Sequence, residues 1–150
     1  MSRFYGKKPA KNIEKIVKTP YTLYYPHSIP VTERNWDDEY YQVVSIDPGY
    51  INYALRIERR YKNGWIVPVV FNKVKIDGLE EIDGITNEKT YDNLDTVLNQ
   101  YKTYFQQCHF VIIERQLPMN YRAVRVSQHT ISYFCNLLRD NSLLPYIYEV

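Results

Sequence analysis

The sequence predicts an α/β protein built on a five-stranded mixed sheet, in which three antiparallel strands come first and parallel strands with flanking helices follow. Short runs of β-branched and aromatic residues, separated by turn signals, fill the first half of residues 39–150. In the second half, apolar residues recur at helical spacing on both sides of one unbroken apolar run. The predicted element order is therefore β-β-β-α-β-α-β, with right-handed crossovers that add the parallel strands.

Turn residues delimit the first three strands. The first is an apolar run that ends in an Asp-Pro-Gly turn, and the second alternates apolar and polar residues. An Asn-Gly pair then predicts a tight hairpin, because both residues tolerate a positive φ. Pro68 indicates that the third strand is broken or lies at a sheet edge. The three predicted strands are residues 41–46, 52–58 and 65–74.

Two predicted helices flank the fourth strand. Residues 91–108 have apolar side chains at helical spacing, with Thr90 or Asp92 as the expected N-cap. Residues 110–113 are continuously apolar, which is typical of a strand buried on both faces. Residues 123–138 repeat the helical pattern, and residues 146–150 begin a fifth strand at the end of the sequence.

Residues 1–38 differ in composition from the rest and predict an extended N-terminal arm. They contain four of the eight prolines and show neither a helical nor a strand period. Up to Lys18 there are six basic residues and one acidic residue, although the net charge of the whole chain is only +2. Lys7, Lys8 and Lys11 are therefore candidate DNA contacts. The alternative is a solvated tail that packs on the domain.

Composition favours a soluble, intracellular protein. The two cysteines, Cys108 and Cys135, lie far apart and form no Cys-x-x-Cys motif, so we expect free thiols in a reducing compartment and no structural zinc. No apolar run is long enough to span a bilayer, so no membrane association is expected.

Two carboxylate residues come directly after predicted apolar strands. Asp47 follows the first predicted strand and Glu114 follows the fourth. The RNase H-like fold is the main common fold with this element order, and there these two strands are neighbours. A pair of carboxylates at such a position suits Mg²⁺ or Mn²⁺, which supports phosphodiester hydrolysis. The alternatives are that Asp47 is part of a turn only and that Glu114 forms an ion pair with Arg115.

Three segments carry a family resemblance. Residues 45–54 (SIDPGYINYA) and 112–116 (IIERQ) resemble the first two motifs of RuvC-like Holliday junction resolvases. Residues 120–129 (NYRAVRVSQH) are most similar to the resolvases of poxviruses and other large cytoplasmic DNA viruses. The resemblance implies that Asp47 and Glu114 are the first two metal ligands, and catalytic. It also implies supporting roles for Asn52 and Gln116, and a DNA-facing helix side with Arg122, Arg125 and His129, for which an ordinary solvated face is the alternative.

The resemblance also implies a function. The expected protein is a Mg²⁺- or Mn²⁺-dependent endodeoxyribonuclease that resolves four-way junctions and branched viral replication intermediates. It would act as a homodimer in the host cytoplasm. In this family two further carboxylates lie on a helix after the fifth strand, and that last helix is absent here because the sequence stops at Val150. A catalytically inactive junction-binding module, or a fragment that retains the fold, is therefore the first alternative, and a nuclease for RNA–DNA hybrids is the second.

Overall fold

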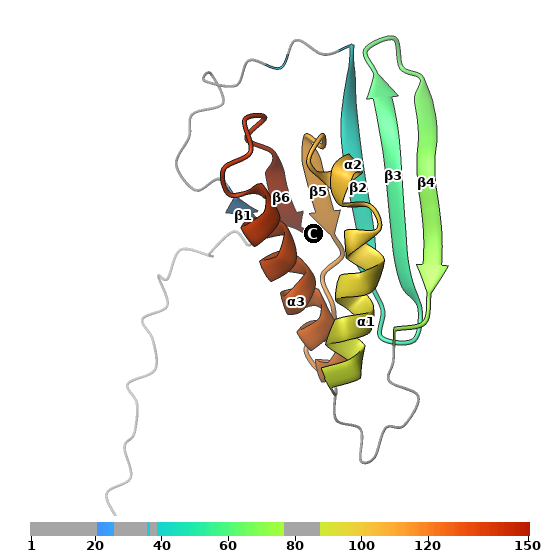
Figure 1. Cartoon of the computed structure of the whole chain (residues 1–150), viewed down its shortest axis with the longest axis vertical. Coiled ribbons are helices and arrows are strands. Elements are labelled where there is room, and N and C mark those ends of the chain that lie inside the picture. The colour runs from blue at the N-terminus through green and yellow to red at the C-terminus, as the bar shows by residue number, and fades with distance from the viewer. Residues whose placement is uncertain (1–20, 26–35, 37–38, 77–87) are drawn as a thin grey trace, which may run out of the picture.

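The structure is a computed structural model, and it describes residues 21–25, 36, 39–76 and 88–150 (Figure 1). The strands are β1 (Thr22–Tyr25), β2 (Tyr40–Pro48), β3 (Tyr53–Tyr61), β4 (Ile66–Val74), β5 (Phe110–Ile113) and β6 (Tyr146–Glu149). The helices are α1 (Glu88–Asn99), α2 (Lys102–Phe105) and α3 (Tyr121–Leu138). None of the described helices is long and apolar enough to cross a membrane.

The described strands form one mixed sheet with the order β1-β6-β5-β2-β3-β4. β2, β3 and β4 are antiparallel neighbours, whereas β5 runs parallel to β2 and β6 runs parallel to β5. The mixed α/β fold and the predicted adjacency of the first and fourth strands are confirmed. Across the sheet, the strands β4, β3, β2, β5 and β6 have the order and directions of the RNase H-like fold.

The predicted number of strands was wrong, because the sheet has a sixth strand. β1 lies in the segment that we expected to form an arm without strand structure, and it pairs antiparallel with β6. Without β1, the edge of β6 would present unpaired backbone N–H and C=O groups. The backbone of β1 pairs with this edge, and its tyrosines favour the strand conformation. The four residues of β1 are too few for a period-2 pattern to be visible in the sequence.

The helix boundaries also differ from the prediction. The single helix expected over residues 91–108 is two helices, with a break at Tyr101, whose φ of −110° and ψ of 11° are not helical. α1 begins at Glu88, so neither Thr90 nor Asp92 is its N-cap, and Thr90 is buried. Both Leu98 before the break and Phe105 after it are fully buried, so packing decides the geometry here.

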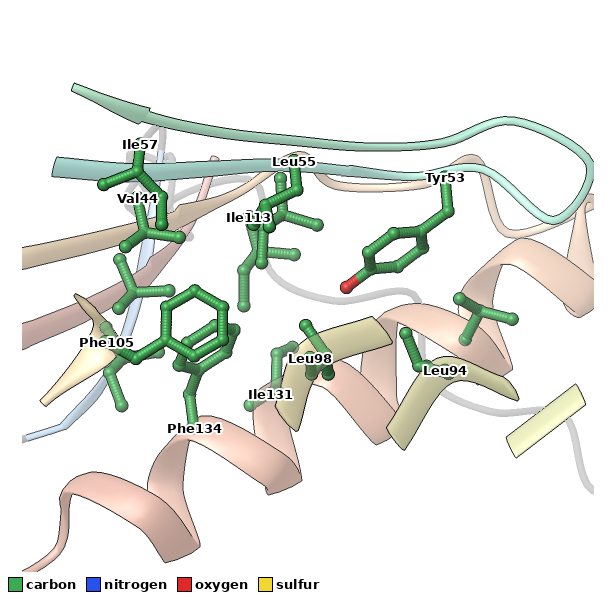
Figure 2. Close-up of a cluster of buried hydrophobic side chains, with 14 of the residues drawn as sticks. Val44, Tyr53, Leu55, Ile57, Leu94, Leu98, Phe105, Ile113, Ile131 and Phe134 are labelled. Atoms are coloured by element: carbon green, nitrogen blue, oxygen red, sulfur yellow. The ribbon is translucent and has the colours of Figure 1, made fainter. Parts of the chain in front are cut away.

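The core lies between the sheet and the helices. Figure 1 shows α1 and α3 over the same face of the sheet. In Figure 2, side chains from the strands face Leu98, Ile131 and Phe134 from the helices. Tyr53 reaches across this layer, and its hydroxyl lies 2.9 Å from that of Thr130. Alternate residues of the strands therefore point away from the helices, toward the opposite face.

Candidate active site

Asp47 and Glu114 occupy matching positions on neighbouring strands. Ile46 pairs with Ile113 in the parallel β2–β5 ladder, and the backbone N–H of Glu114 donates to the carbonyl of Ile46 at 2.9 Å. Neighbouring strands lie about 4.8 Å apart, so the two residues that follow this pair are close together. Ile46 and Ile113 are buried in the core, whereas Asp47 and Glu114 are exposed. Both carboxylates therefore lie on the face of the sheet opposite the helices.

The two carboxylates line one open pocket of about 400 Å³. Arg56 of β3 and Phe71 of β4 also line this pocket, as does Val150, which follows β6. The guanidinium of Arg56 pairs with Glu58 at 3.2 Å, and Glu58 is 5% exposed. A second arginine, Arg60, contacts the same carboxylate at 2.9 Å. Glu58 thus holds Arg56 at the border of the pocket.

The donor set at this pocket fits a hard divalent cation. Carboxylate oxygens are ligands that Mg²⁺ and Mn²⁺ prefer, and two of them on adjacent strand ends can bind one ion together. Asp47 and Glu114 are the residues that would hold it. In the part of the chain that the structure describes, no group of three or more His, Cys, Asp or Glu side chains could hold a metal ion.

A tight turn follows Asp47 at the carboxyl end of β2. β2 ends at Pro48, β3 begins at Tyr53, and these two residues are register partners. A Cβ atom on Gly49 would lie 2.3 Å from the backbone oxygen of Asn52, which is far inside van der Waals contact. Glycine is therefore required for the close backbone approach in this turn. The side chain of Asn52 is exposed on the turn and does not line the pocket.

Gln116 lies on the other side of the β5 carboxyl end. Its Nε2 donates to the backbone oxygen of Glu114 at 3.1 Å, which fixes the chain just after the carboxylate. Its side chain lines a second cavity, together with Arg115, and not the pocket that contains Asp47. The supporting roles predicted for Asn52 and Gln116 stay predictions.

The three candidate DNA contacts on α3 have different surroundings. The Arg122 guanidinium lies 5.5 Å from the centre of the Tyr50 ring, beside the turn that follows Asp47. Arg125 is exposed and lies over Tyr121 at 5.6 Å.

His129 instead connects α3 to α1. Its Nε2 lies 2.7 Å from Asp95 Oδ1, and its ring packs against Tyr91. Arg122 therefore lies beside the turn that follows Asp47, and a role in DNA binding stays a prediction for all three. Lys7, Lys8 and Lys11 lie outside the described residues.

Sequence reasoning missed Arg56, Phe71 and Val150 as neighbours of the carboxylates. Arg56 pairs with Ser45, and Ser45 lies two residues before Asp47 on β2. Because side chains alternate between the two faces of a strand, Arg56 is on the same face as Asp47, and period-2 alternation on β3 could have predicted this. Phe71 pairs with Arg56 in turn. The hairpin register, which only the assembled sheet reveals, decides that these side chains meet.

The proteins that are similar to this chain include a viral protein and two solved structures. An uncharacterized protein, 170L of invertebrate iridescent virus 6, is 23% identical over 124 residues, which cover 65% of this chain. The chain spans about half the length of that curated relative. No family model matches the chain.

The RuvC structure of Thermus thermophilus matches with a TM-score of 0.49 and 15% identity, covering 72% of this chain and 63% of RuvC. The yeast mitochondrial Holliday junction resolvase Ydc2 matches with a TM-score of 0.46 and 11% identity, covering 73% and 50% of the two chains.

Proposed function

We propose that this chain is the core of a metal-dependent endonuclease that cuts branched DNA, with four-way junctions as its substrate. The observation that carries the proposal is the placement of Asp47 and Glu114 side by side at the carboxyl ends of β2 and β5, lining one open pocket. Two carboxylates at such a position have little use in stabilising the described part of the fold, because both are exposed and neither forms an ion pair with another described residue.

The chemistry that suits this pocket is phosphodiester hydrolysis. A divalent ion bound there would activate water and stabilise the charge that develops on the phosphate oxygens. Asp47 and Glu114 would hold the ion. Arg56 and Arg60 share the single carboxylate of Glu58, so one net positive charge beside the pocket remains to attract the DNA backbone. The motif at residues 45–54 and the stretch at 120–129 support junctions as the substrate and a large DNA virus as the source. A two-fold dimer would match the symmetry of a four-way junction, so that opposing strands are cut in a paired way.

The first test is cleavage of a labelled four-way junction beside a matched linear duplex, with Mg²⁺, Mn²⁺ or a chelator. We expect metal-dependent nicking that is selective for the junction. Asp47→Asn and Glu114→Gln should lower the cleavage rate by about 10³-fold or more, because each removes a ligand charge from the ion. Junction binding, measured by fluorescence anisotropy, should persist.

Asp92→Asn is the matched control, because Asp92 is exposed on α1 and does not line the pocket. This variant should cleave at the wild-type rate. Normal cleavage by Asp47→Asn or Glu114→Gln would contradict the proposal. Junction binding by the wild-type chain without cleavage would favour the second candidate, a junction-binding module, since two carboxylates are all that the described residues bring to the pocket.

A further inference from the structure

A second cavity, of about 240 Å³, is lined in part by the residues that follow Glu114. This half-open cavity is lined by the loop after β5, the first half of α3, and the β1 and β6 strands. The polar residues in its wall are Tyr24, Arg115, Gln116, Ser127, Gln128 and Glu149. Glu114 lines the carboxylate pocket, whereas the next two residues line this cavity. Consecutive residues advance at most about 3.6 Å each, so the two openings are neighbours along the chain.

Ser127 is the unusual residue in this wall. Its side chain is buried, with 2% exposure, and its Oγ has no hydrogen-bond partner among the described residues. Buried hydroxyl groups are nearly always paired, because an unpaired one loses its hydrogen bonds to water without replacement. Because Ser127 lines the cavity, its hydroxyl is available to hydrogen-bond a ligand bound there.

The charges around the cavity favour a neutral ligand. Arg115 Nε lies 3.1 Å from Glu149 Oε1, and its Nη2 donates to Thr22 Oγ1 at 2.7 Å. Its positive charge is therefore balanced by Glu149, and the pair leaves no net positive charge to attract an anion such as phosphate. Burial and the nearby Glu149 raise the pKa of Tyr24, so its hydroxyl stays protonated. The remaining groups are the amides of Gln116 and Gln128, each with a donor and an acceptor.

We propose that this cavity binds an unpaired nucleobase from the branched DNA, next to the bond that is cut. Such a base is neutral and planar and carries donors and acceptors on one edge, which matches the amides and the Ser127 hydroxyl. Tyr24 provides an aromatic wall on the β1 side. Glutamine amides pair best with adenine, so adenine is the expected base. The identification of the base with branched DNA rests on the proposed endonuclease function.

The experiment measures nucleoside binding without catalysis. Saturation-transfer NMR of the full chain would use the four deoxynucleosides and inorganic phosphate as probes. We expect deoxyadenosine to receive the strongest saturation, and Ser127→Ala and Gln128→Ala to weaken its binding by at least about five-fold. Ser132→Ala is the matched control, because Ser132 is an exposed serine of the same helix and does not line the cavity. It should bind like the wild type.

The thermal stability of Ser127→Ala separates a ligand role from a structural one. Loss of an unpaired buried hydroxyl should raise the melting temperature while binding weakens, whereas loss of a structural group would lower it. The proposal is overturned if no nucleoside binds, if phosphate displaces the nucleoside, or if Ser127→Ala binds deoxyadenosine like the wild type.

Junction cleavage distinguishes this inference from the proposed function. Junctions that carry each of the four bases in turn next to the branch point would be cut by the wild type and by Gln128→Ala. We expect the wild type to prefer adenine at this position and the variant to lose at least about five-fold of that preference. Nucleoside binding without any junction cleavage would contradict the endonuclease and leave the base pocket intact. Cleavage without base preference or nucleoside binding would contradict the base pocket alone.

Discussion

Gly49 shows how one residue positions the candidate site. The turn after Asp47 brings two backbone segments so close that a Cβ atom at Gly49 would lie 2.3 Å from a backbone oxygen. Backbone atoms cannot move aside as a flexible side chain can, so the clash would shift the turn and the end of β2 with it. The Asp-Pro-Gly sequence thus has a steric role in addition to supplying the carboxylate.

Gly49→Ala should lower the free energy of unfolding by about 1–3 kcal/mol. The comparison is Gly64→Asn in the β3–β4 hairpin, where the φ of 93° is positive but nothing lies within 4 Å of an added Cβ. Asparagine tolerates positive φ better than most residues, so this variant should cost less. Urea unfolding of both variants measures the difference. An unfolding free energy for Gly49→Ala within about 0.5 kcal/mol of the wild type would contradict the steric argument.

At the scale of elements, β1 and Trp36 attach the N-terminal segment to the sheet. β1 pairs with β6, and Thr22 receives a hydrogen bond from Arg115. The indole N–H of Trp36 donates to the carbonyl of Leu143 at 2.6 Å, and its ring packs edge-on against Phe110 and Tyr146. Part of the predicted arm is therefore a structural element of the domain.

Deletion of residues 1–38 should destabilise the protein, because it exposes the hydrogen-bonding edge of β6 and removes the Trp36 contacts. We expect a lower melting temperature and concentration-dependent association, measured by thermal unfolding and light scattering. Deletion of residues 1–18 is the control, since it retains β1 and Trp36 and should unfold like the full chain. Equal melting temperatures for the two deletions would mean that β1 contributes nothing to stability.

For the whole molecule, burial of two ionisable groups in the core should lower the free energy of unfolding at alkaline pH. Burial raises the pKa of the Cys108 thiol from 9.0 to about 12 and also raises the pKa of Tyr53. Both groups lie in the layer between the sheet and the helices. In the unfolded chain they ionise near their ordinary values, whereas in the folded protein they stay neutral. Their contribution to stability is therefore complete below pH 9 and is lost as the pH rises toward the folded values.

The free energy of unfolding should thus fall above pH 9, by up to about 1.4 kcal/mol per pH unit for each group. Urea unfolding between pH 7 and pH 10.5 tests this. Cys108→Ala should have a flatter pH dependence between pH 9 and pH 10, although its overall stability is lower because it leaves a small cavity. Parallel curves for the variant and the wild type would show that the thiol is not protected from ionisation.

Local patterns in the sequence determined most of the strands and the two candidate ligands. β5 was predicted with its observed bounds, because an unbroken apolar run has few alternatives to a buried strand. Asp47 and Glu114 could be selected because each follows such a run and belongs to a recognisable motif. These signals depend on residues close together in the chain, so the sequence alone contains them.

Only the tertiary structure decided which distant residues meet. The pairing of β1 with β6, the break at Tyr101 and the approach of Arg56 to the carboxylate pocket depend on packing and register across the sheet. The unpaired hydroxyl of Ser127 likewise became visible only once α3 was packed beside β1 and β6. Such features depend on which distant segments bury each other and share hydrogen bonds, so no pattern of neighbouring residues in the sequence can predict them.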